Sequence, residues 1–154
     1  MLGDWVVPTA ISALLVFVGW IVLYRNARKL ASRNEAFTFA SRINAKLKEI
    51  SDLSEDFWLK GTYNNDPQVY EFLTLSKIKS LNLKLKIMEE RQLKLNDNSK
   101  YLFDIRRACT YSASNISKLS LPKKREEMSN ILDALDVLES ELDKLLKTKF
   151  PPNY

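Results

Sequence analysis

The chain contains no histidine and only one cysteine, Cys109, among its 154 residues. The lack of histidine excludes histidine-based catalytic triads, zinc sites with histidine ligands and phosphotransfer through histidine. A single cysteine cannot form a disulfide within the chain, which suits a reducing compartment. Arg106 and Arg107 are near Cys109 in sequence and are of the type that lowers a thiol pKa. A lone cysteine among apolar positions is nevertheless typical of a core, and we interpret Cys109 in that way.

Residues that interrupt helices are also scarce. After residue 24 the chain has one glycine, Gly61, and four prolines, and its three glycines in total do not form a phosphate-binding loop. Valine, a strong strand former, occurs after residue 24 only at Val69 and Val137. The composition therefore predicts an all-α fold.

The longest apolar run extends from Trp5 to Tyr24 and contains no charged residue. As a helix its twenty residues would span about 30 Å, which matches the hydrocarbon thickness of a bilayer. Trp5 at one end and Trp20 and Tyr24 at the other are typical of the aromatic belts at the two membrane interfaces. A central helix of a soluble protein is the alternative, but this run is apolar on all sides and longer than most buried helices. The sequence predicts a transmembrane anchor whose partner is the lipid bilayer.

Charges flanking the apolar run predict its orientation. Asp4 precedes it, which is the reverse of the basic start of a signal peptide. Four basic residues without an intervening acid follow it, and the positive-inside tendency places these in the cytoplasm and the N-terminus outside. We expect them to contact anionic lipid: Arg25, Arg28, Lys29 and Arg33. Residues 25–154 carry 24 basic and 18 acidic side chains, a net charge of +6, which is too modest and too mixed to favour nucleic-acid binding.

Periodic apolar positions predict four helices after the anchor. They begin near Arg25, Pro67, Ser99 and Pro122, and short turns separate them. The second would end near Leu95 and bury Phe72, Leu75, Ile78, Leu81, Leu85 and Met88. The third is the least regular, and the last has a heptad-like rhythm that favours packing inside a bundle over a free coiled coil. We predict one transmembrane helix followed by an antiparallel bundle of about four helices, divided as anchor 1–24, basic segment 25–33, cytoplasmic bundle 34–149 and proline-rich tail 150–154.

Acidic pairs in the bundle do not form a recognisable metal site. Adjacent Glu89 and Glu90 point about 100° apart on a helix, and a ferritin-like dimetal centre also requires histidines. Asp133 and Asp136 are interpreted as solvent-facing. We expect no metal, no cofactor and no enzymatic activity.

Two groups of residues are candidates for binding a protein partner. Phe57, Trp58 and Tyr63 cluster around the first turn, where exposed rings would form a hot spot, although they are better explained as a cap on the end of the core. Pro151, Pro152 and Tyr154 belong to a PPxY tail that resembles the ligands of WW domains. Prolines at this place also simply end a helix.

The favoured hypothesis is a membrane-tethered, non-enzymatic helical interaction module at the cytoplasmic face of a membrane. Its expected partners are the bilayer and another protein, and the heptad-like last helix also permits a homo-oligomer. The alternative hypothesis is a small membrane-acting effector or exclusion protein that oligomerises through its span and changes permeability. Small residues near one face of the anchor, Thr9, Ser12 and Ala13, motivate it.

Overall fold

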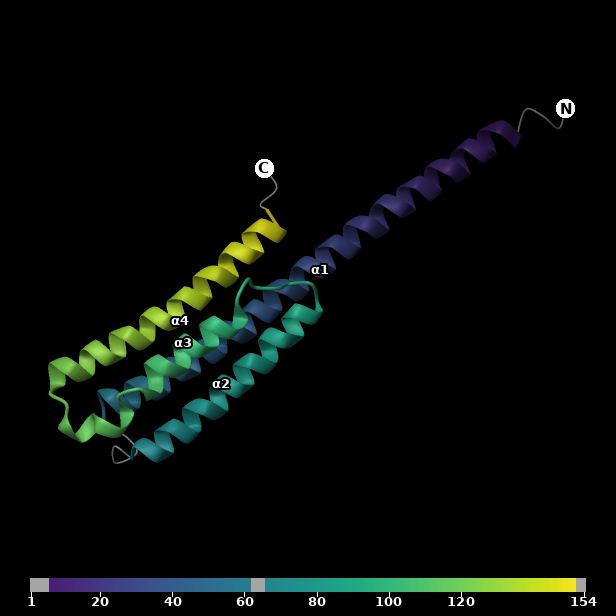
Figure 1. Cartoon of the computed structure of the whole chain (residues 1–154). Coiled ribbons are helices and arrows are strands. Elements are labelled where there is room, and N and C mark those ends of the chain that lie inside the picture. Colours follow the sequence, from purple (N-terminus) through teal and green to yellow (C-terminus); the bar gives the residue numbers. More distant parts are fainter. Residues whose placement is uncertain (1–5, 62–65, 152–154) are drawn as a thin grey trace. The chain divides into compact units, whose positions relative to one another are not determined.

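The computed structural model describes residues 6–61 and 66–151, with side chains from residue 11 onward. These residues form four α-helices and one 3₁₀ helix and contain no strand, so the all-α prediction is confirmed (Figure 1). The elements are α1 Val6–Trp58, α2 Pro67–Glu90, α3 Asn98–Thr110, η2 Ala113–Lys118 and α4 Leu121–Lys149. The chain divides into two compact units, Met1–Glu35 and Ala36–Tyr154, and α1 contributes to both.

Side-chain caps fix the starts of α2 and α3. The Asp66 carboxylate accepts hydrogen bonds from the backbone N–H groups of Gln68, at 2.9 Å, and Val69. Pro67 follows at the first helical position, where its missing N–H costs nothing. The Asp97 carboxylate accepts from the N–H of Lys100 at 3.0 Å. Both starts agree with the sequence signals.

The end of α2 comes earlier than predicted. The helix stops at Glu90 instead of near Leu95, and Gln92 adopts a φ of 62°. A residue in this left-handed conformation cannot continue a right-handed helix. The chain turns there, and Leu93 and Leu95 are buried in the non-helical segment that follows. These two leucines are apolar because they cover the core, and not because they continue the helix.

The third predicted helix is interrupted. Helix α3 ends at Thr110, and a turn separates it from η2, in which Ala113 and Ile116 are buried. Cys109 in α3 is also buried, as predicted for a core residue. Ala113 and Ile116 therefore extend the core beyond the end of α3.

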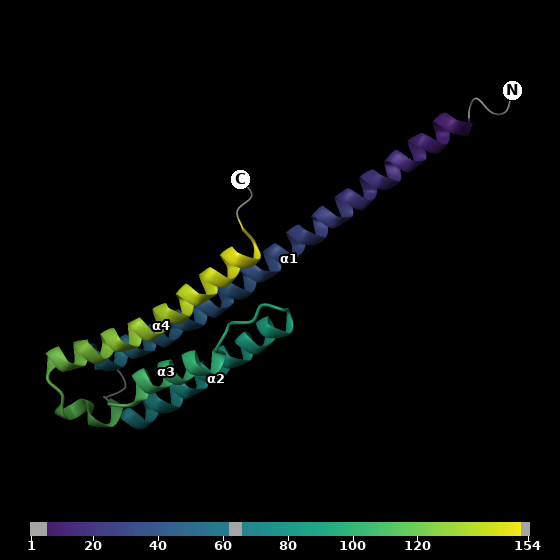
Figure 2. The same cartoon turned by 45° about the horizontal axis from the view of Figure 1, so that its top comes forward.

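The second unit is a helical bundle in which consecutive helices run in opposite directions (Figure 2). Glu49 of α1 pairs with Lys77 of α2, and Asn44 of α1 donates a hydrogen bond to Glu139 of α4 at 3.2 Å. Helix α3 packs against both α2 and α4. Helices α2 and α4 therefore occupy opposite corners of the bundle and run in the same direction.

The sequence placed two residues of α2 on the wrong face. Phe72 and Leu75 are exposed, whereas Tyr70 and Thr74 occupy the inner face together with Ile78 and the three later residues of the predicted stripe. Tyr70, Thr74 and Ile78 follow one another at intervals of four, so they share a helix face with the rest of the core stripe. The buried stripe begins with Tyr70 and Thr74, whose polar groups exclude them from a search for periodic apolar residues.

Candidate functional site

The first compact unit carries a continuous exposed apolar surface. Every large apolar side chain from Ile11 to Tyr24 is exposed, including Trp20 and Tyr24. By length and composition, the described helix from Ile11 onward is long and apolar enough to cross a membrane. Trp5 lies outside the described residues. An apolar surface that covers all sides of a helix exceeds what soluble monomers normally expose to water.

Basic side chains follow this apolar surface directly. Arg25, Arg28, Lys29 and Arg33 are exposed along α1. Their spacing of three and four residues keeps them on one side of the helix. The structure therefore places the aromatic residues Trp20 and Tyr24 and the four basic residues in consecutive turns of one element.

The aromatic residues near the end of α1 form part of the core. Phe57 and Trp58 are buried, with the Phe57 ring stacked on that of Tyr70 at a centroid distance of 3.9 Å and edge-on to that of Trp58 at 5.4 Å. The prediction that these two rings are exposed for a partner is wrong, because packing against α2 covers both. Their burial agrees with the favoured interpretation, in which they belong to the end of the core. Tyr63, Pro152 and Tyr154 lie outside the described residues, and Pro151 is exposed.

A small group of buried hydroxyl and thiol groups lies between α1, α2 and α3. The Ser54 and Tyr70 hydroxyls are hydrogen-bonded at 3.0 Å, and Thr74 and Cys109 are also fully buried. Burial raises the pKa of the Cys109 thiol from its ordinary value of 9.0 to about 11, and it raises the pKa of Tyr70 as well. The thiol is therefore protonated at neutral pH and is a poor nucleophile.

This burial predicts a loss of stability at alkaline pH. The thiol ionises near 9.0 when exposed but only near 11 in the folded chain, so ionisation favours the unfolded chain as the pH rises through this interval. The free energy of unfolding should fall by on the order of 2 kcal/mol from this residue. Urea denaturation at several pH values measures it. The Cys109→Ala variant keeps Tyr70 and should lose less stability over the same interval. Identical pH dependence of the two chains would contradict the assignment.

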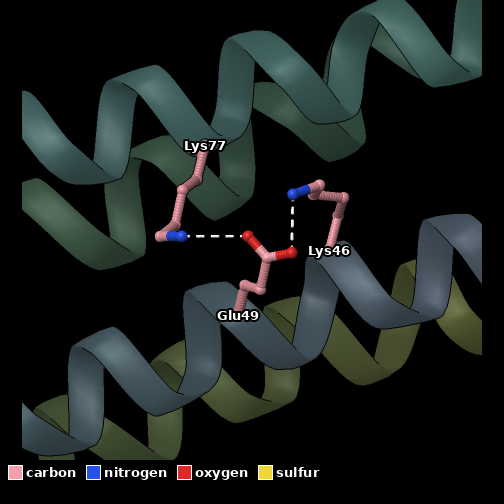
Figure 3. Close-up of polar contacts among 3 residues, drawn as sticks. All are labelled: Lys46, Glu49 and Lys77. Carbon is pink, nitrogen blue, oxygen red and sulfur yellow. Dashed lines mark hydrogen bonds and ion pairs between the residues drawn. The ribbon is translucent and has the colours of Figure 1, made fainter.

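An ion-pair network joins α1 to α2 on the surface of the bundle (Figure 3). The Glu49 carboxylate lies between the ammonium groups of Lys46, at 2.6 Å, and Lys77, at 2.9 Å. Hydrogen bonds from Lys46 and Lys77 lower the pKa of Glu49. Because the three side chains are part-exposed, the pairs contribute little to stability.

The outer side of α2 is the surface that sequence reasoning missed. Phe72 exposes 73% of its area and Leu83 exposes 60%. Exposed Val69, Leu75 and Ile87 flank them. The signal for this surface is the inner stripe of Tyr70 and Thr74, which requires Phe72 to point outward. Among the described residues no group of three or more Asp, Glu or Cys side chains is arranged to hold a metal ion.

Comparison of the chain with protein-family models, curated proteins and solved structures found no match. The functional argument is therefore made from the residues themselves.

Proposed function

We propose that this chain is a single-pass membrane protein with a helical interaction module attached to its anchor. The observation that carries the proposal is the exposed apolar surface from Ile11 to Tyr24. In water this surface would be solvated on every side, whereas in a bilayer its leucine, isoleucine, valine and phenylalanine side chains each favour insertion by roughly 0.3 to 0.6 kcal/mol. Trp20 and Tyr24 would lie at the interface that the basic residues mark.

The proposed orientation places the bundle in the cytoplasm. The chain has no Lys or Arg before residue 25, and Arg25, Arg28, Lys29 and Arg33 follow the apolar surface. Basic residues close to a span remain on the cytoplasmic side, where the anionic leaflet contributes about 1 kcal/mol for each. The four exposed side chains support this orientation.

The proposed role of the bundle is to bind protein without catalysis. Its buried polar residues, Ser54, Tyr70, Thr74 and Cys109, are packed inside the core, and its largest exposed apolar side chains lie on the outer helix surfaces. Tethering raises the effective concentration of such a surface for other membrane-bound chains without adding a contact. An outer helix surface is accordingly the proposed binding region.

Alkali extraction and thiol labelling test attachment and orientation. The full chain should stay in the membrane pellet at alkaline pH, and a chain of residues 25–154 should be released. For orientation, Ser114→Cys adds an exposed thiol beyond α3, and Cys109→Ala removes the native one. A maleimide that cannot cross membranes should label this residue only after the membrane is permeabilised. Release of the full chain would refute attachment, and labelling of intact cells would refute the orientation.

A further inference from the structure

The outer side of α2 presents a stripe of apolar and charged side chains. Phe72 and Leu83 are separated by about three helical turns and therefore share a side. Lys79, Lys86 and Glu90 are exposed on the same side. We call these five residues, Phe72, Lys79, Leu83, Lys86 and Glu90, the α2 face.

A stripe with the same spacing lies on α4. Ser129, Asp136, Ser140, Asp143 and Lys147 are all exposed, and the last four help to line a shallow polar depression. We call these five residues the α4 face. Taken in order, the five residues of the α4 face correspond to the five of the α2 face. Ser129 and Ser140 correspond to Phe72 and Leu83. Each of the three charged residues corresponds to a residue of opposite charge. The charges of the two faces are therefore complementary, and Ser140, which corresponds to Leu83, lies in the depression.

The bundle also sets the relative height of the two faces. Helices α2 and α4 run in the same direction in both views (Figures 1 and 2). Near the C-terminal ends of the two helices, the Lys149 ammonium donates a hydrogen bond to the backbone oxygen of Gln92 at 3.4 Å. These two residues are 57 positions apart in the sequence. The faces have the same difference, since Phe72 corresponds to Ser129 and Glu90 to Lys147. Corresponding residues therefore lie at about the same level of the bundle.

The charges on both faces form no direct ion pair within the described residues, although Lys86 is near enough to Glu89 to help lower the pKa of that carboxyl. No ion pair joins any of them to another side chain in the described part of the molecule, unlike nearby Lys77, Lys94 and Lys144, which are all paired. The charges concerned are those of Lys79, Lys86, Glu90, Asp136, Asp143 and Lys147. Because α2 and α4 occupy opposite corners, they cannot neutralise one another within one copy.

We propose that the α2 face of one copy docks on the α4 face of a second copy, with the two helices parallel. This contact pairs Lys79 with Asp136, Lys86 with Asp143, and Glu90 with Lys147, and it seats Phe72 and Leu83 against the two serines. Since different faces meet, each copy keeps one free face of each kind, and the association continues as a row of bundles.

Charge also disfavours symmetric contacts in parallel register, because each charged residue would then face its own copy. Two α2 faces in contact would bring lysines together, and two α4 faces would bring aspartates together. The parallel direction is the one that pairs all three charges of each face, including Glu90 with Lys147. The proposal rests on the proposed function in one respect, because anchoring in a shared bilayer raises the effective concentration of the copies. The complementarity of the two faces is independent of the membrane.

Crosslinking between two cysteine variants of the full chain tests the contact. One copy carries Leu83→Cys and the other, with a different tag, carries Ser140→Cys. A short bismaleimide is added to membranes that contain both. We expect a product that contains both tags when the variants are co-expressed, and no self-product above the parent chain, whose only cysteine is buried, when either is expressed alone. Equal self-products, or none from the mixture, would overturn the proposal.

Charge reversal provides the specificity control, and a second cysteine pair tests direction. Lys79→Glu with Lys86→Glu should reduce the mixed product about tenfold, as expected for two reversed ion pairs. Asp136→Lys with Asp143→Lys on the other copy should restore it, and a failure to restore it would count against the pairing.

Phe72→Cys should crosslink to Ser129→Cys and not to Lys147→Cys, and the reverse result would refute the parallel direction. Alkali extraction of the same membranes reports on the anchor separately, so loss of the chain from the pellet refutes attachment and loss of crosslinking from retained chains refutes docking.

Discussion

Replacing Phe57 by alanine is expected to lower the free energy of unfolding of the bundle by about 3 to 5 kcal/mol. The ring is fully buried, stacked on Tyr70 of α2 and edge-on to Trp58. Its removal leaves a cavity where α1 meets α2 and eliminates two aromatic contacts, each worth about 0.5 to 1.5 kcal/mol beyond the area buried. A loss of this size is a large fraction of the stability of a small domain.

The measurement is urea denaturation of the detergent-solubilised full chain, followed by far-ultraviolet circular dichroism. Phe103→Ala is the matched control, because it removes the same atoms from a ring that is 60% exposed on α3. It should change the stability by less than about 0.5 kcal/mol. Similar losses for the two variants would show that Phe57 does not occupy the core position described here.

Replacing Leu15 by arginine is expected to prevent stable membrane insertion. Leu15 lies near the middle of the apolar surface and is exposed. Arginine at the centre of a span costs roughly 2.5 to 3.5 kcal/mol, and the favourable leucine contribution is lost as well. This change offsets most of the few kcal/mol that favour insertion and lowers the ratio of inserted to uninserted chain by about a hundredfold.

Leu30→Arg is the control for this substitution. Leu30 is also an exposed leucine of α1, but it follows the first three basic residues, where another positive charge agrees with the positive-inside tendency. Leu30→Arg should remain in the alkali-washed pellet and Leu15→Arg should appear in the supernatant. Retention of both variants to the same extent would mean that the apolar surface is not the anchor.

The anchor proposal and the helical content could be derived from sequence because they depend on local properties. A twenty-residue uncharged run, scarce glycine and proline, and the Asp66 cap before Pro67 act within a few turns of the chain. Periodicity likewise predicted most of the inner face of α4, where the first five residues of the predicted stripe are buried: Met128, Ile131, Leu135, Leu138 and Leu142. The sixth, Leu145, is only partly buried, and Leu146 takes the core position. In such segments the sequence pattern and the tertiary packing agree.

The end of α2 and its inner face could not be predicted from local sequence patterns, because both depend on tertiary packing. Gln92 ends α2 because the chain must turn there to let Leu93 and Leu95 cover the core. The inner face of α2 begins with Tyr70, whose hydroxyl is hydrogen-bonded to that of Ser54, sixteen residues away on α1. Since that hydrogen bond exists only after the helices pack, apolar counting selected Phe72 instead of Tyr70.

By itself, the sequence determined an all-helical chain with an apolar N-terminal helix followed by basic residues, because helix propensity, hydrophobicity and charge are properties of short segments. Only the tertiary structure decided that Phe57 and Trp58 are buried while Phe72 and Leu83 are exposed. It also decided that α2 and α4 run in the same direction at opposite corners of the bundle. These facts depend on which helices pack together and on their register, and such long-range contacts leave no periodic trace in a single sequence.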